Sequence, residues 1–161
     1  MHGTGKNKMQ FQGNRRYNYY SAFIKKHFGH RVQKISINTG LTCPNRDGTK
    51  GYGGCTYCNN NTFSPDYCRS TKTVSQQLKE GILFFSQKQI SQKYLAYFQS
   101  YSNTYSSTEI LKEMFLEAVN YPDVVGLVIG TRPDCINPSI VDMLSEISKK
   151  YFVALEFGVE S

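Results

Sequence analysis

The chain has 161 residues and a mass of 18.4 kDa, which is the size of one domain. Its hydrophobic content of 39% and charged content of 19% exclude a disordered polar chain. No stretch approaches the roughly 18 apolar residues of a membrane-spanning helix, and the amino terminus has no apolar signal-peptide core. We therefore expect a cytoplasmic protein without membrane contact, whose five cysteines are ligands or free thiols rather than disulfides.

Positive charge is concentrated near the amino terminus. Nine of the 19 Lys and Arg lie in residues 1–46, where no acidic residue occurs, and the remaining ten face twelve Asp and Glu. Aromatic residues are interleaved with these cations, which is typical of nucleic-acid binding: Arg15, Arg16, Tyr17, Tyr19, Tyr20, Lys25, Lys26, His27 and Arg31. The alternative is a solvated arm followed by an amphipathic helix.

The first half of the chain predicts two helices around a long loop. Helical spacing predicts a short helix over 20–28, capped by Gly29, and alternation predicts a strand over 32–37. A glycine- and cysteine-rich loop over 39–71 is too long for a simple connection and is expected to be functional. Thr73 and Gln76 form a capping box that opens a helix running to about residue 90.

The second half continues the alternation. We expect a strand over 94–99, a polar loop over 100–107, and a helix that stops before Pro122. The apolar run 124–129 predicts a buried strand, followed by a loop over 130–137, a helix capped by Asn137, and a fourth strand over 151–157. Tyr and Phe of the helices are expected in the core, as are four aliphatic residues of the last helix, Ile140, Val141, Leu144 and Ile147.

The order β-α-β-α-β-α-β predicts an α/β fold with a parallel sheet and helices outside. We assign residues 1–30 to a basic arm and short helix, and residues 31–161 to the α/β region. Four strands cannot close a barrel, which needs about eight. We therefore expect a chain truncated after its fourth strand, with one sheet edge exposed. The loops that follow the strands should converge on one face, where sites lie in parallel folds.

Three cysteines of the long loop predict a metal site. Eleven residues separate Cys43 from Cys55, and two separate Cys55 from Cys58. A structural zinc site needs four ligands, whereas an iron–sulfur cube bound by three cysteines presents one iron with an open position. Spacing alone leaves both metals open and favours the cluster. Cys68 and Cys135 are not expected to be ligands.

These motifs resemble the radical S-adenosylmethionine superfamily, in the branch that includes the Elongator catalytic subunit. The resemblance rests on the cysteine triplet with Tyr57 before Cys58, on Thr131-Arg132-Pro133-Asp134 after the third strand, and on the closing segment 156–161. The segments 43–48 and 99–104 are closer still to a bacterial group related to Elongator, whose full-length members are considerably longer. The resemblance covers residues 30–161. It implies the amino-terminal part of a (β/α)6-type partial TIM barrel.

The resemblance also implies cofactors and their ligands. Cys43, Cys55 and Cys58 would bind a [4Fe-4S] cluster, and its open iron would bind S-adenosyl-L-methionine. Reductive cleavage would then produce a 5′-deoxyadenosyl radical, with the electron coming from a flavodoxin- or ferredoxin-type donor. Many members carry Gly-Gly-Glu after the second strand, where this chain has Gln99-Ser100-Tyr101. The implied cofactor-binding residues are therefore Tyr57, Gln99, Asn103, Thr131, Arg132 and Glu160.

Three functions stay open. The favoured one is an enzyme that modifies tRNA, at a wobble-uridine-type site, which the Elongator-like motif and the basic segment jointly suggest. The second is a zinc-binding RNA-interaction module without catalysis. The third is a radical enzyme that acts on an anionic small molecule such as a porphyrinogen. Arg132 has an alternative role as the partner of Asp134 or Glu156 at the strand end.

Overall fold

The computed structural model describes residues 17, 19–56, 58–59, 64–86 and 93–159. Its contacts divide the chain into two compact units, Met1–Val32 and Gln33–Ser161. Among the described helices, none is long and apolar enough to cross a bilayer.

The first unit contains α1 (Tyr20–Phe28), which ends as predicted at Gly29. Gly29 has the left-handed φ of 75°, and its N–H donates to the carbonyl oxygen of Lys25. Only Ile24 of this helix is buried, whereas Tyr20 and Phe23 are 45% and 50% exposed. The prediction that the helix aromatics lie in the core is wrong for α1, because this nine-residue helix buries only one side chain. The Phe23 ring instead stacks on that of His27.

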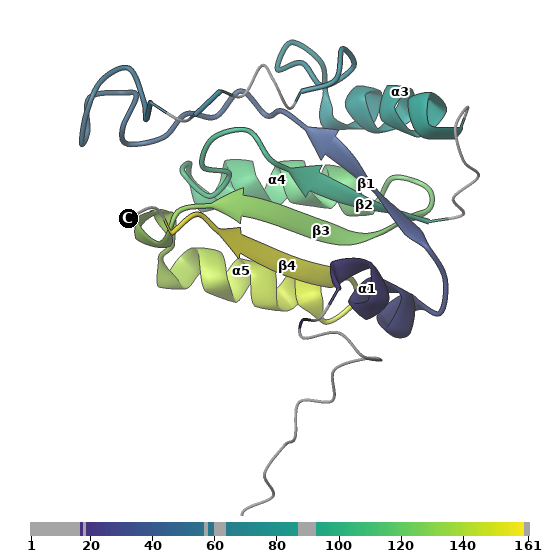
Figure 1. The fold of residues 1–161 in the computed structure, drawn as a ribbon. Coiled ribbons are helices and arrows are strands. Elements are labelled where there is room, and N and C mark those ends of the chain that lie inside the picture. The colour runs from purple at the N-terminus through teal and green to yellow at the C-terminus, as the bar shows by residue number, and fades with distance from the viewer. Residues whose placement is uncertain (1–16, 18, 57, 60–63, 87–92, 160–161) are drawn as a thin grey trace, which may run out of the picture. The chain divides into compact units, whose positions relative to one another are not determined.

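The second unit is an α/β layer whose strands lie in chain order. The sheet order is β1-β2-β3-β4, and the pairs β2–β3 and β3–β4 are parallel. A helix follows each of the first three strands, and α4 and α5 lie behind the sheet in the view of Figure 1. The elements are β1 (Val32–Ile37), α3 (Val74–Ser86), β2 (Lys93–Phe98), α4 (Thr108–Val119), β3 (Val124–Thr131), the short 3-10 helix η1 (Pro133–Cys135), α5 (Pro138–Ser148) and β4 (Phe152–Phe157).

The core lies between the sheet and the three helices. Because side chains alternate along a strand, Ile35, Ala96, Phe98, Leu127 and Ile129 face the helices and are fully buried. Phe98 contacts Phe115 of α4 edge to face, with ring centroids 5.0 Å apart. The strand residues between these positions belong to the opposite face of the sheet.

Local signals place the helix starts correctly. Thr73 and Gln76 exchange hydrogen bonds of 3.0 and 3.1 Å, as a capping box requires. Asn137 accepts from the N–H of Ile140 at 3.0 Å, with Pro138 in the first turn of α5. The described part of α3 ends at Ser86, and the predicted continuation to residue 90 lies outside the described residues.

Two predictions at the other elements are wrong. The third strand does not end at Ile129 but continues to Thr131, because β4 pairs with it as far as Thr131 and Phe157. The strand ladder thus reaches two residues into the segment predicted as a loop. Val141 is 48% exposed although its neighbour Ile140 is buried, because adjacent residues of a helix point about 100° apart.

Candidate functional site

The loops after β1, β2 and β3 are joined by the buried side chain of Asn103. Its Nδ2 donates to the carbonyl oxygens of Phe98 and Gly130 at 3.1 and 3.0 Å, and its Oδ1 accepts from the Thr39 hydroxyl at 3.3 Å. The backbone N–H of Asn103 also donates to Gly130 O, at 3.1 Å. Asn103 has no exposed surface. The amide predicted to bind a cofactor therefore holds three strand ends together.

Thr131 has a similar structural role at the end of β3. Its hydroxyl lies 2.5 Å from the hydroxyl of Thr104, which also donates to the carbonyl oxygen of Cys135 at 2.6 Å. Both threonines are at most 5% exposed. This pair links the β2 loop to the turn that follows β3, so the two loops share one set of buried hydrogen bonds.

The cysteine loop is fastened to the same edge of the sheet at three points. Lys50 Nζ lies 2.5 Å from Asp134 Oδ2 in the turn after β3. The Thr49 hydroxyl lies 2.9 Å from the Tyr105 hydroxyl in the β2 loop. Just before Cys43, the Thr42 carbonyl oxygen accepts a long bond of 3.4 Å from the β2 loop. The segment that carries the cysteines is thus held beside the carboxyl ends of β2 and β3.

Asp134 is paired with two cations. Arg132 meets it with two hydrogen bonds of 2.8 and 2.9 Å, and Lys50 approaches its second oxygen. Hydrogen bonds from Arg132 and then Lys50 hold the pKa of the Asp134 carboxyl well below its usual range. The same pairing raises the pKa of Arg132 further, so Arg132 and Asp134 both stay charged at neutral pH. Arg132 is thus the partner of Asp134, which is one of the two roles predicted for it.

The three cysteines of the loop differ in exposure, and none of them forms a disulfide within the part of the chain that the structure describes. Cys43 is buried, Cys55 is half-buried and Cys58 is exposed. Cys43 lies within electrostatic reach of Arg132, which places the first thiol near the turn after β3. Among the described residues, no three His, Cys, Asp or Glu side chains are grouped as a metal site.

The donor chemistry of this loop still suits a thiolate-bound metal. Three cysteine sulfurs occur in one glycine-rich segment, and the Asn45 side-chain amide donates to Cys55 Sγ at 3.2 Å. Cys68 and Cys135 are buried. Burial raises the pKa of Cys68 to about 11 and also raises that of Cys135. The raised pKa values of Cys68 and Cys135 disfavour the thiolate that a metal requires, whereas Cys55 and Cys58 are more accessible donors.

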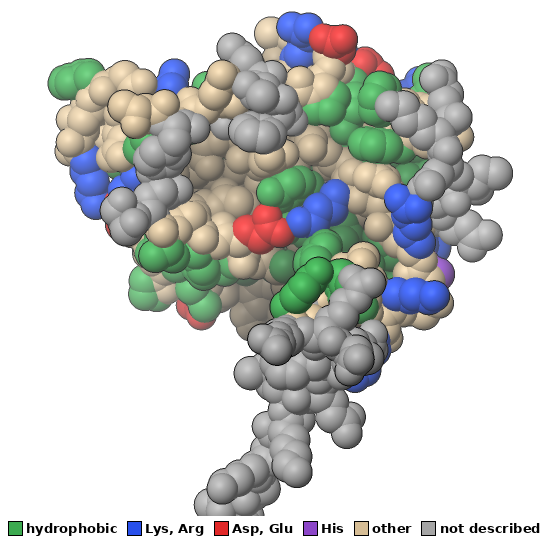
Figure 2. All heavy atoms as spheres, viewed as in Figure 1, with side chains coloured by type: hydrophobic (Ala, Val, Ile, Leu, Met, Phe, Trp, Pro, Cys, Tyr) green, Lys and Arg blue, Asp and Glu red, His purple; other side chains and the backbone are tan. Residues whose placement is uncertain are grey.

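The sheet face opposite the helices carries an ion pair. Lys34 of β1 reaches Glu156 of β4, with 2.6 Å between Nζ and Oε1, and its ammonium lies 4.3 Å from the centre of the Tyr97 ring. Ser36 of β1 donates to the Gln99 side-chain oxygen at 3.4 Å. Figure 2 shows an acidic and a basic side chain side by side in the middle of the face turned to the viewer, with hydrophobic side chains around them.

The predicted cofactor-binding residues thus fall into three groups. Asn103 and Thr131 are buried in the strand-end hydrogen bonds, whereas Gln99 and Arg132 keep partial exposure. Tyr57 and Glu160 lie outside the described residues. Sequence reasoning missed Lys34 and Lys50, whose partners are 122 and 84 residues away. A single lysine within a glycine-rich turn was the only available signal for Lys50.

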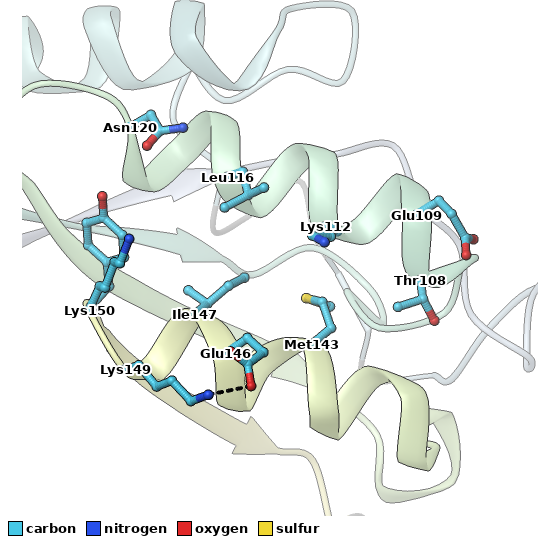
Figure 3. Close-up of a pocket in the computed structure, with 11 residues that line it drawn as sticks. Thr108, Glu109, Lys112, Leu116, Asn120, Met143, Glu146, Ile147, Lys149 and Lys150 are labelled. Carbon is cyan, nitrogen blue, oxygen red and sulfur yellow. Dashed lines mark hydrogen bonds and ion pairs between the residues drawn. The ribbon is translucent and has the colours of Figure 1, made fainter.

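A separate groove of about 550 Å³ runs between α4 and α5, on the helical side of the unit (Figure 3). Its walls contain Leu116, Met143 and Ile147, with Lys112 and the Lys149–Glu146 ion pair also lining it. None of the cysteines, and none of the predicted cofactor-binding residues that the structure describes, lines this groove. It is therefore distinct from the candidate site at the strand ends.

The chain is similar to three bacterial and archaeal proteins. It is 36% identical over 145 residues to protein YhcC of Escherichia coli K12, which covers 89% of this chain and 46% of that protein. It is 35% identical over 150 residues to the uncharacterised YtqA of Bacillus subtilis, covering 91% and 46%. With the uncharacterised MJ0486 of Methanocaldococcus jannaschii the identity is 34% over 145 residues, covering 88% and 44%. The chain spans about half the length of these curated relatives. No family profile and no solved structure matches it.

Proposed function

We propose that the chain is part of a radical S-adenosylmethionine enzyme. The observation that carries the proposal is the fastening of the three-cysteine loop to the carboxyl ends of β2 and β3, through Lys50–Asp134 and Thr49–Tyr105. Sites of parallel α/β folds lie at this edge. The sequential strand order, with one helix after each of the first three strands, supports a (β/α)6-type partial barrel in the whole protein.

In this proposal, Cys43, Cys55 and Cys58 hold a [4Fe-4S] cluster. The bound cluster supplies the electron that cleaves S-adenosyl-L-methionine to methionine and a 5′-deoxyadenosyl radical. The side chains of Gln99 and Arg132 stand at the strand ends with partial exposure, where they meet the polar groups of the nucleoside cofactor. A flavodoxin- or ferredoxin-type protein delivers the electron.

Asn103 and Thr131 act in a different way in the proposed enzyme. Their polar groups bond to neighbouring strand ends. They keep the three loops at fixed separations, which proximity-based catalysis requires. The Lys34–Glu156 pair lies on the sheet face that a barrel encloses, so it contributes polar groups to the interior.

The substrate we propose is tRNA. The support is the cationic and aromatic amino-terminal segment: Lys25 and Lys26 lie in the last turn of α1, and Tyr20 and Phe23 are about half exposed. Cations bind phosphates, and exposed rings stack on bases. Arg15 and Arg16 lie outside the described residues.

Metal analysis of the reconstituted chain tests the proposal. After anaerobic reconstitution, we expect about four iron and four sulfide per chain, and loss of both in Cys43→Ala, Cys55→Ala and Cys58→Ala. Cys68→Ala and Cys135→Ala are the matched controls, because they remove a thiol outside the proposed ligand set, and they should keep the iron. A colourless protein with stoichiometric zinc would support the RNA-binding module and end the radical proposal.

A further inference from the structure

Asn45 joins the two arms of the cysteine loop. It stands two residues after Cys43, and its side-chain Nδ2 lies 3.2 Å from Cys55 Sγ. Its backbone carbonyl oxygen accepts from the N–H of Gly54 at 2.9 Å. Both its side chain and its main chain therefore connect the segment that begins at the first cysteine to the residues around the second.

The position of this amide is fixed by its neighbours. Pro44 O accepts from the N–H of Lys50 at 2.8 Å, and Cys43 O accepts from the N–H of Arg46 at 2.9 Å. The Arg46 guanidinium lies 4.7 Å from the centre of the Tyr101 ring in the β2 loop. The residues on both sides of Asn45 are thus anchored, which holds its amide against the Cys55 sulfur.

An N–H group that donates to a cluster sulfur changes the electronic state of the cluster. It withdraws electron density from the thiolate, and it stabilises the more negative, reduced cluster more than the oxidised one. Hydrogen bonds to the sulfurs are among the main determinants of cluster reduction potential. A donor at this place therefore makes the cluster easier to reduce.

We infer that Asn45 is a positioning residue for the cluster, whose amide holds the Cys55 sulfur and raises the cluster reduction potential. The inference rests on the proposed function. Asn45 is not one of the proposed cluster ligands. Its proposed role is to influence the reduction potential of the bound cluster, which can be measured.

Two substitutions test the inference. Asn45→Leu keeps the approximate shape of the side chain and removes the donor, while Asn45→Asp replaces the donor with a charged acceptor. In both, the backbone bond to Gly54 can still form. In an EPR-monitored redox titration of the reconstituted chain, we expect a lower reduction potential for Asn45→Leu. The reduction equilibrium should change by up to about tenfold, which is 59 mV for one electron. Asn45→Asp should shift it further in the same direction.

Thr49→Val is the matched control. It removes a side-chain hydrogen bond from the same loop, the one to Tyr105, without touching a sulfur. If Asn45 only stabilises the loop, the reduction potential should change equally in Asn45→Leu and Thr49→Val. The inference predicts that it changes in Asn45→Leu only. A reduction potential in Asn45→Leu that equals that of the unsubstituted chain would overturn the inference.

A second measurement needs no variant. In the reduced, unsubstituted chain with 15N in its asparagine amides, pulsed EPR should detect a nitrogen coupled to the cluster. Absence of this coupling in a protein that does hold four iron would overturn the inference and leave the proposed function intact. If the unsubstituted chain binds no iron and sulfide, it is the proposed function that fails, and the inference fails with it.

Discussion

Lys50 Nζ lies 2.5 Å from Asp134 Oδ2, although 84 residues separate the two in the chain. This ion pair fastens the middle of the cysteine loop to the turn after β3. It is partly exposed, since the Lys50 side chain is 52% accessible and that of Asp134 is 30% accessible. An exposed pair of this kind adds little to global stability, about 0–1 kcal/mol. Removing this pair should therefore change the position or mobility of the cysteine loop and hardly change the free energy of unfolding.

Lys50→Met should weaken retention of the proposed cluster while leaving the fold nearly unchanged. We expect iron loss to a chelator to accelerate several-fold, because the loop loses one of its anchors, and the free energy of unfolding to change by less than about 1 kcal/mol. Glu146→Gln is the control, since it breaks the exposed Lys149–Glu146 pair on the helical side. Equal rates of iron loss in Lys50→Met and the unsubstituted chain would contradict the role of this anchor.

Asn103→Ala should destabilise the fold strongly. It removes the side-chain donor of the Phe98 carbonyl and the acceptor of the Thr39 hydroxyl, while Gly130 O keeps its bond from the Asn103 N–H. Each unsatisfied buried group costs about 1–3 kcal/mol. We expect a loss of about 2–4 kcal/mol in urea unfolding. Asn120→Ala is the matched control at the exposed end of α4 and should stay within about 0.5 kcal/mol. A similarly small change at Asn103 would show that its bonds do not hold the strand ends.

The stability of the chain should fall in alkali because of Cys68. The unfolded chain ionises this thiol near its ordinary pKa of 9.0, whereas burial raises the folded pKa to about 11. The unfolded state therefore releases a proton that the folded state keeps, and the free energy of unfolding decreases from pH 9 to 11, by roughly 1–2 kcal/mol. Cys68→Ala should flatten that decrease in urea titrations at each pH.

Tyr67→Phe tests whether the adjacent Tyr67 phenol, rather than Cys68, causes the loss of stability in alkali. Burial raises the pKa of Tyr67 to about 12, so its contribution begins only above pH 10. Its buried hydroxyl lies near Ser36, which opposes part of the rise in pKa that burial causes. Its removal should cost little at pH 7, because no well-formed hydrogen bond to the described residues is lost. A slope between pH 9 and 10 that stays the same in Cys68→Ala would contradict the assignment.

Gly126→Ala should disrupt the pairing of β3 with β4. A Cβ at this position would lie 2.2 Å from the carbonyl oxygen of Phe152, its partner in the strand register. A backbone atom cannot move aside as a flexible side chain does, so we expect a loss of at least about 2 kcal/mol in thermal or urea unfolding. Gly51→Ala is the control, because its Cβ would have no neighbour closer than 3.7 Å. Equal stability of the two variants would contradict the close packing of β3 against β4.

Binding of tRNA should depend steeply on salt if the basic segment contacts phosphates. Replacing Lys25 and Lys26 with Gln should reduce the slope of log K against log salt by up to about 0.7–0.9 for each phosphate that the variant no longer neutralises. The control is Lys149→Gln together with Lys150→Gln, which removes the same charge beside the groove between α4 and α5. An equal change of slope in both double variants would indicate nonspecific electrostatic attraction. No change in either variant would indicate that the basic segment is a solvated arm that does not contact tRNA.

The sequence determined the order of the elements and most of their starts. Signals of this kind are local: the capping box Thr73–Gln76, the Asn137 cap and Gly29 each act within a few residues. Strand ends were harder to predict, because β3 extends to Thr131 only through its pairing with β4. The cysteine triplet was also visible in the sequence, since its spacing is a property of one segment.

The roles of the residues around that triplet were decided by tertiary structure. Asn103 and Thr131 follow strands in a way that suits cofactor binding, but they are buried by hydrogen bonds to other loops. Lys50 and Asp134 meet only when the cysteine loop folds over the end of β3. A side chain satisfies its polar groups with the nearest partner in space, and that partner is set by the sheet order and not by distance along the chain. For this reason the sequence predicted that the cysteine loop and the loops after β2 and β3 meet at the carboxyl edge of the sheet, and the fold decided which of their residues pair there and which stay accessible.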